Sequence, residues 1–223
     1  MNKTFNWVTG ASDMARHAYR AFVMLAATLA LGACAGIGTV PPAPQVLDVG
    51  IADEPQVALP ARAAMVVLPV EPAPLLRGDG VIWREKGSLQ PSAYASFQWA
   101  SPPADLFGQR LRERLSVEGP VVEHNVSGSL PEIRVYLEKF EQVFDPAARG
   151  EGQPVSTGEI ALRAVLAHRG QVIDQLRFAL SVPAATGDAT GGARALRAAV
   201  DAATESIAQW LSQQPVLRGA SGG

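Results

Sequence analysis

The chain has 223 residues, of which 48% are hydrophobic, with a formal net charge of −2 and a single cysteine. A chain of this length can bury a sizeable core as one domain, whereas one thiol excludes any intrachain disulfide. The weak negative charge makes nucleic acid and anionic lipid headgroups poor electrostatic partners.

The first segment with a clear signature ends at Cys34. An apolar run over residues 21–33 closes with the letters LGAC, which is the pattern of a bacterial lipobox. The run is shorter than the roughly 20 residues of a membrane-spanning helix. It follows a basic stretch, as in a signal peptide: Arg16, His17 and Arg20. We therefore expect residues 1–33 to be a signal peptide, with Met14 as the true start, and Cys34 to carry diacylglycerol and palmitate.

The residues after Cys34 indicate where the protein is anchored. Asp directly after the lipidated cysteine is the usual inner-membrane retention signal in enterobacteria, and here that position holds Ala35. This favours the periplasmic face of the outer membrane. Residues 34–62 are rich in Pro and Ala and predict a tether. Within it the alternating residues 46–50 are either an edge strand or plain linker.

Residues 63–213 carry the pattern of one folded domain. Short apolar or β-branched runs predict strands at 64–70, 81–84 and 97–100, with a loop from 87 to 95. A helix should then run from Pro102 to about 118, capped by Ser101. One face of this helix is apolar, and the charged residues on it are expected to face largely outward: Arg110, Arg112, Glu113 and Arg114.

The second half of the domain alternates with a period of two. It predicts strands at 133–140, 160–166 and 176–182, with a bulge before Phe140 and a tight hairpin at 168–171. An amphipathic helix is expected from 193 to 212, and residues 214–223 should be disordered. This order describes an α+β two-layer sandwich, a mainly antiparallel sheet with two amphipathic helices.

Motifs that carry chemistry are not evident in the sequence. His124 and His168 lie in turn-like surroundings without a Cys or carboxylate at metal-ligand spacing. Neither a P-loop nor a nucleophile elbow occurs, and the glycine-rich residues 187–192 lack the lysine of a phosphate-binding loop. We therefore expect no enzymatic activity, no metal and no cofactor.

Several segments, in this order, resemble the ABC-type transport auxiliary lipoprotein family, the group of the paraquat-inducible C lipoprotein. They are the lipobox, the strands at 47–50, 68–69 and 81–84, and an aromatic-x-Trp-x-x-Pro-Pro segment that ends at Pro103. Val46 departs from the tyrosine that is usual in the family. The resemblance implies a non-enzymatic partner of an MCE-domain protein and its ABC transporter, which move lipid across the envelope and support membrane integrity.

Two other classes of function stay open on the sequence. A lipid-anchored α+β domain also suits an outer-membrane lipoprotein that supports the assembly of a β-barrel. A periplasmic hydrolase would have to build its site from loop serines and the two histidines.

The partner surface is expected on the sheet face that the helices leave uncovered. The side opposite the aliphatic row should carry Tyr136, Phe140 and Arg163, a mixture of aromatic and Arg residues typical of interfaces. Together with the strand of Trp83, this face is predicted to mediate docking to the MCE protein or homo-oligomerisation. Phospholipid is a further candidate ligand.

Overall fold

The computed structural model describes residues 42–50, 57–123, 128–148 and 156–218. Its contacts divide the chain into Met1–Pro42 and Ala43–Gly223, and the second unit is the subject here. Met14, Cys34 and the predicted signal peptide lie outside the described residues. None of the described helices is long and apolar enough to cross a membrane.

The sheet is built on β7 (Glu132–Phe144), a strand of 13 residues. One edge of β7 pairs antiparallel with β8 (Ser156–His168), which pairs in turn with β9 (Gln171–Pro183). A tight turn joins β8 to β9, and Arg169 and Gly170 adopt positive φ angles of 51° and 77° there. The predicted hairpin and its alternating strands are thus confirmed.

The other edge of β7 is shared by three short parallel strands that follow one another along it. These are β2 (Met65–Val67), β3 (Glu71–Pro72) and β4 (Gly80–Glu85). The sheet extends beyond them through β5 (Ser92–Trp99), β1 (Gln45–Leu47) and β6 (Val121–Val122). Three short 3-10 turns complete the described elements: η1 (Pro74–Leu76), η2 (Pro146–Ala148) and η3 (Pro215–Leu217).

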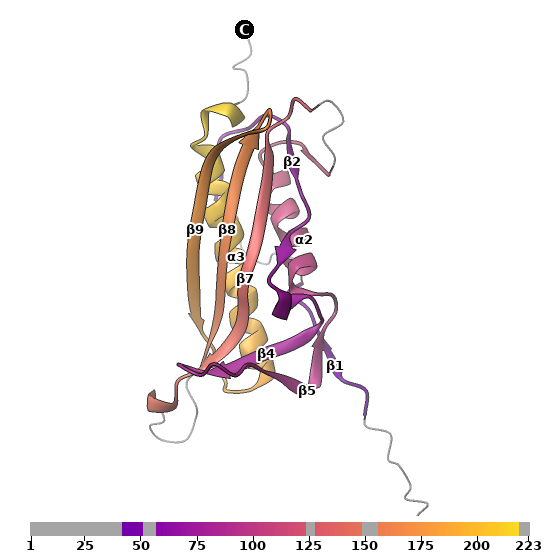
Figure 1. Ribbon diagram of the computed structural model, residues 1–223, viewed down its shortest axis with the longest axis vertical. Coiled ribbons are helices and arrows are strands. Elements are labelled where there is room, and N and C mark those ends of the chain that lie inside the picture. The colour runs from indigo at the N-terminus through magenta and orange to yellow at the C-terminus, as the bar shows by residue number, and fades with distance from the viewer. Residues whose placement is uncertain (1–41, 51–56, 124–127, 149–155, 219–223) are drawn as a thin grey trace, which may run out of the picture. The chain divides into compact units, whose positions relative to one another are not determined.

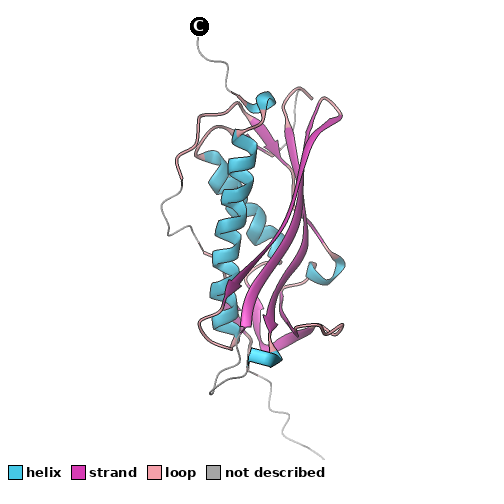
Figure 2. Cartoon of the chain, turned by 90° about the vertical axis from the view of Figure 1, so that its left-hand side faces the viewer, coloured by secondary structure: helices cyan, strands magenta, loops and turns pink. Residues whose placement is uncertain are grey.

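Two helices, α2 (Pro103–Ser116) and α3 (Ala189–Ser212), cover one face of the long strands (Figure 2). Both bury the apolar residues that their spacing predicts, because a stripe repeating every three or four residues faces one side of a helix. The core between the layers contains Phe107, Leu111, Leu137, Leu162, Leu196, Val200 and Ile207, each at most 1% exposed. The α+β fold class is confirmed, with the long strands antiparallel and most of the short ones parallel.

Glycine permits a close approach of α3 to the sheet at Gly158 in β8. A β-carbon at this position would lie 2.6 Å from the backbone nitrogen of Leu196. Such a distance is far inside van der Waals contact, so any larger residue would push α3 away from the sheet.

Several local expectations are corrected. The side chain of Ser101 does not cap α2, whose N-cap is Pro102. The loop expected to reach residue 95 already becomes β5 at Ser92, and α3 begins at Ala189, capped by Asp188, whose Oδ1 accepts from the amide of Gly191 at 2.7 Å.

The ends of the domain also differ from expectation. Residues 45–47 form an edge strand of the sheet, which is one of the two alternatives for this stretch, so the expected tether of 34–62 is partly folded. At the other end, the turn η3 continues the domain beyond 213 and buries Leu217 to 1% exposure.

The charged face of α2 is the clearest departure. Arg110 and Arg114, expected to face outward, are each only 2% exposed because acids on α3 receive them. Arg110 donates to Asp201 Oδ1 at 2.7 and 2.5 Å. Arg114 donates to Glu205 Oε2 at 2.7 Å and to Glu118 Oε1 at 2.5 Å. The two arginines are four residues apart on α2, and their partners Asp201 and Glu205 are four residues apart on α3 in the same order. The two helices therefore run locally in the same direction.

We predict that Arg114→Ala costs about 3–5 kcal/mol of the free energy of unfolding, because it removes the ion-pair partner of the buried Glu118. The hydrogen bond from Arg114 also lowers the pKa of Glu205 from its usual 4.5. This stabilisation is present above pH 4.5 and is lost as the pH falls through the folded-state pKa. Urea unfolding at neutral and acidic pH measures both effects. Arg112→Ala on the same helix is the control, and an equal loss there would contradict the prediction.

Candidate functional site

The uncovered face of the sheet carries an aromatic side chain stacked with an arginine. Tyr136 of β7 lies opposite Arg163 of β8, and the guanidinium carbon of Arg163 is 3.9 Å from the centre of the Tyr136 ring. This is the distance of a cation–π contact. Figure 1 looks onto this face, with the helices behind β7, β8 and β9. The structure therefore brings together two of the four residues predicted for the partner surface.

Charged side chains surround this pair. Glu138 accepts a hydrogen bond from Arg177 at 2.8 Å and lies 3.9 Å from Arg163. Arg134 lies 3.8 Å from Glu71 of β3. A hollow of about 360 Å³ lies beside them, and its lining includes Tyr136, Arg163, Val165 and Gln175. We call Arg134, Tyr136, Glu138, Arg163 and Arg177 the open-face cluster.

Phe140 does not belong to this cluster, so its placement on the open face is wrong. The β7–β8 register shifts between Leu137 and Lys139, which moves the residues after the bulge to the other side of the strand. Phe140 is 1% exposed and packs edge-on against Trp99, with ring centres 5.4 Å apart. The predicted bulge is real, and the side chain that it redirects is Phe140 itself.

Trp83 also lies away from the open-face cluster. It pairs with Gln142 in the register of β4 against β7, so both side chains point to the same side of the sheet. That side is the helix side, because Gln142 lies against Gly192 of α3. The expectation that Trp83 shares a surface with Tyr136 and Arg163 is therefore corrected.

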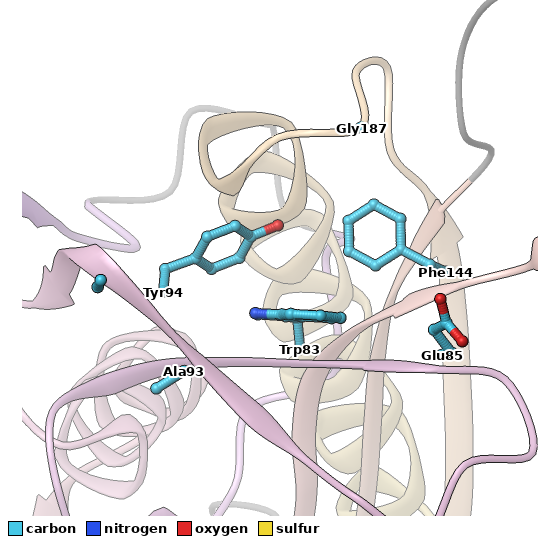
Figure 3. Close-up of a pocket in the computed structure, with 7 residues that line it drawn as sticks. Trp83, Glu85, Ala93, Tyr94, Phe144 and Gly187 are labelled. Atoms are coloured by element: carbon cyan, nitrogen blue, oxygen red, sulfur yellow. The ribbon is translucent and has the colours of Figure 1, made fainter.

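Trp83 forms the floor of a separate pocket at the end of the sheet where α3 begins (Figure 3). The pocket has a volume of about 460 Å³ and is lined by three aromatic rings, one carboxylate and small residues: Trp83, Tyr94, Phe144, Glu85, Ala93, Ala95 and Gly187. Sequence reasoning missed Tyr94 and Phe144, since the first was assigned to a loop and the second to the segment after a strand. The cluster of aromatics at 83, 94 and 97 was the available signal.

A buried hydrogen-bond chain fixes one wall of the pocket. The Tyr94 hydroxyl donates to Gln142 Oε1 at 2.8 Å, and Gln142 Nε2 donates to Ser156 Oγ at 2.8 Å. Burial, followed by the nearby charge of Asp188, raises the pKa of Tyr94 to about 12. Tyr94 is therefore a neutral phenol at physiological pH, held in one orientation by a fully buried amide.

A second ionic cluster lies on the open side of β7, beyond the bulge. Arg84 Nε is 2.7 Å from Glu141 Oε1, and Lys139 Nζ is 3.5 Å from the same oxygen and 3.0 Å from Glu159. Glu141 is 2% exposed, so these cations compensate a buried charge. The charged residues at this end of β7 therefore have a structural role, because they neutralise one another.

His168 is the one histidine within the described ranges, and it contacts a backbone carbonyl. His168 Nε2 lies 3.0 Å from the carbonyl oxygen of Ser129, and His124 lies outside the described residues. Within the described ranges, no group of three or more His, Cys, Asp or Glu residues could hold a metal ion.

Comparison with known proteins gives one family and several similar folds. A family model described as ABC-type transport auxiliary lipoprotein component matches residues 46–208. The chain resembles the crystal structure of a Xanthomonas campestris protein of family DUF330, with a TM-score of 0.62, 18% identity, and coverage of 75% of this chain and 95% of that one. A second solved structure, of an uncharacterized protein, has a TM-score of 0.56 and 19% identity and covers 70% and 95% of the two chains. No curated protein matches. At these identities the structural likenesses establish the fold alone.

We predict that Tyr94 contributes a pH-dependent part of the stability. Its folded-state pKa of about 12 lies above the usual value of 10, so between these values the unfolded chain loses a proton that the folded chain keeps. The stability should therefore fall as the pH rises from about 10 to 12. Ultraviolet titration of phenolate and chemical unfolding across this range measure it. Tyr94→Phe should remove this part of the dependence, and an unchanged profile would contradict the assignment.

Proposed function

Because the chain belongs to the ABC-type transport auxiliary lipoprotein family, we propose that it is a non-enzymatic subunit of an ABC/MCE-type lipid transport system. Diacylglycerol on Cys34 would anchor it to the periplasmic face of the outer membrane. The folded domain would then dock to the MCE-domain protein and support envelope lipid trafficking.

The observation that carries the docking role is the uncovered face of β7, β8 and β9. Three long strands present a mixed surface of arginines, a tyrosine and an acid, whereas the opposite face is buried under two helices. Arginine and tyrosine are enriched at protein interfaces. The stacked pair of Tyr136 and Arg163 offers a rigid centre for a contact, with Glu138 and Arg177 as a polar rim.

A non-enzymatic role agrees with the side chains that the domain provides. Asp201, Glu205 and Glu141 are engaged in ion pairs that join different elements of the fold. His168 lies at a hairpin end, against a backbone carbonyl. These contacts give each group a structural task, which supports action through surfaces.

We predict that Cys34 is lipidated and that Cys34→Ser abolishes membrane association, since serine cannot form the thioether. Metabolic labelling with an alkyne fatty acid, followed by fractionation of inner and outer membranes, is the measurement. Fatty-acid label on the Cys34→Ser variant would contradict the assignment of Cys34 as the lipidated residue. Label on the wild type in the inner-membrane fraction would refute the outer-membrane location and leave lipidation standing.

A second prediction concerns the open-face cluster. Tyr136→Ala combined with Arg163→Glu should strongly reduce crosslinking to the MCE protein, or between copies, because it removes the ring and reverses a charge. Thermal unfolding should change little, since a cation–π pair at a partly exposed site contributes about 1 kcal/mol.

The matched control for that experiment is Arg194→Glu, an exposed reversal of charge on the helix side. Normal crosslinking by the double variant would place the contact elsewhere. Co-purification of a β-barrel in place of an MCE protein would favour the assembly class instead.

A further inference from the structure

The pocket at the start of α3 brings three aromatic rings around one space. The centres of Trp83 and Phe144 are 5.8 Å apart with ring planes at 88°, and those of Trp83 and Tyr94 are 6.2 Å apart at 45°. Figure 3 shows the indole as a floor, with Tyr94 and Phe144 on either side. The other two ring centres thus lie about 6 Å from the indole centre, and a cation seated among the three rings would be in the range of cation–π attraction.

The one charged residue in the described lining of this pocket is an acid. Glu85 contributes a carboxylate to the lining, and Asp188 lies near enough to Tyr94 to act on its ionisation. None of the described lining residues is basic. Of the neighbouring cations, Arg84 pairs with Glu141 on the opposite face and Lys86 bonds Asp145 at 2.7 Å, whereas Arg194 acts on Asp188. A cation entering the pocket therefore meets aromatic rings and the carboxylate of Glu85.

The walls distinguish between kinds of cation. A primary ammonium must replace the hydrogen bonds that its N–H groups make to water, and the pocket offers mainly ring carbon, with Glu85 as the one carboxylate in the lining that the structure describes. A quaternary ammonium has no N–H to satisfy, and its methyl groups pack against apolar walls. The volume of about 460 Å³ lies within the roughly 300–1,000 Å³ of small-molecule sites.

We propose that Trp83, Tyr94 and Phe144 form an aromatic cage that binds a quaternary ammonium group, as in choline or a phosphocholine headgroup. The site lies on the helix side of the sheet, away from the open-face cluster, so it does not depend on the proposed docking role. Tyr94 is a positioning element as well as a wall, because its hydroxyl is held by Gln142.

The test titrates the full-length protein, in a non-ionic detergent, with choline and with 3,3-dimethylbutanol, its neutral carbon isostere. The indole N–H signal of Trp83 in NMR spectra, assigned with Trp83→Leu, reports occupancy. Choline should give a saturable shift, and the isostere should bind about fivefold or more weakly, since only the charge differs. Equal binding of the isostere, or no saturable shift with choline, would overturn the proposal.

Two further comparisons sharpen the assignment. Phe144→Leu should weaken choline binding several-fold, whereas Tyr136→Ala, an aromatic lost from the other face, should leave it unchanged. Circular dichroism shows whether the variants fold. If they do not, the comparison of choline with 3,3-dimethylbutanol on the wild-type protein still tests the proposal. Tighter binding of ethanolamine than of choline would also overturn the proposal, because it would indicate a primary ammonium such as a partner's lysine.

Binding of short-chain lipids, below their critical micelle concentration, tests whether the ammonium group belongs to a lipid headgroup or to a free solute. Dihexanoyl phosphatidylcholine is compared with free choline, with dihexanoyl phosphatidylglycerol as the control for the acyl chains. Tighter binding of the phosphatidylcholine than of both others identifies a lipid headgroup. Equal or weaker binding than choline identifies a free solute. Tighter binding of phosphatidylglycerol than of choline would overturn the cage in favour of an acyl-chain site.

Discussion

The bulge in β7 determines what each face of this domain can do. Before it, the odd-numbered residues Ile133, Val135 and Leu137 point to the helices. After it, the even-numbered residues Phe140, Gln142 and Phe144 do so. With an unbroken period of two, Glu141 would enter the core and Phe140 would lie in solvent, and both changes are costly. The bulge resolves this conflict.

Both candidate surfaces depend on the same register shift. Tyr136 precedes the bulge and stays on the open face, where Arg163 stacks on it. Gln142 and Phe144 follow it and build the wall of the aromatic pocket on the helix side. The two surfaces therefore lie on opposite sides of one strand. A ligand in the pocket and a partner on the open face would not compete for the same atoms.

The second constraint is ionic and joins the two helices. Arg110 and Arg114 each bond an acid of α3, and each also donates to a backbone carbonyl of the N-terminal segment, at Gly50 (2.9 Å) and Val57 (3.1 Å). Buried ion pairs of this kind add little net stability compared with apolar packing, but removing one partner strongly lowers the free energy of unfolding. Their role here is to fix how α2, α3 and the N-terminal segment meet.

Local patterns predicted the regular elements well. The alternation along β8 and β9, the hairpin at Arg169-Gly170 and the apolar stripe of α3 are all short-range signals, and each was confirmed. Features that depend on distant partners were missed. The side on which Trp83 lies follows from the register of β4 against β7, which no local pattern records. Arg110 was expected in solvent because the acid that receives it lies on another helix. Tyr94 was assigned to a loop because SAYAS has weak strand propensity, and pairing with β4 overrides this.

The strand β1 sets a limit on how far the domain can stand from its anchor. Pairing of Gln45–Leu47 with β5 leaves eleven residues, 34–44, between the expected lipid attachment and the sheet. At full extension these span at most about 40 Å. If Cys34 carries the lipid as proposed, a linker this short would confine the domain to a thin layer at the membrane surface, where its effective concentration toward a membrane-bound ligand would be high. A transporter rooted in the opposite membrane would therefore have to supply most of the reach across the periplasm itself.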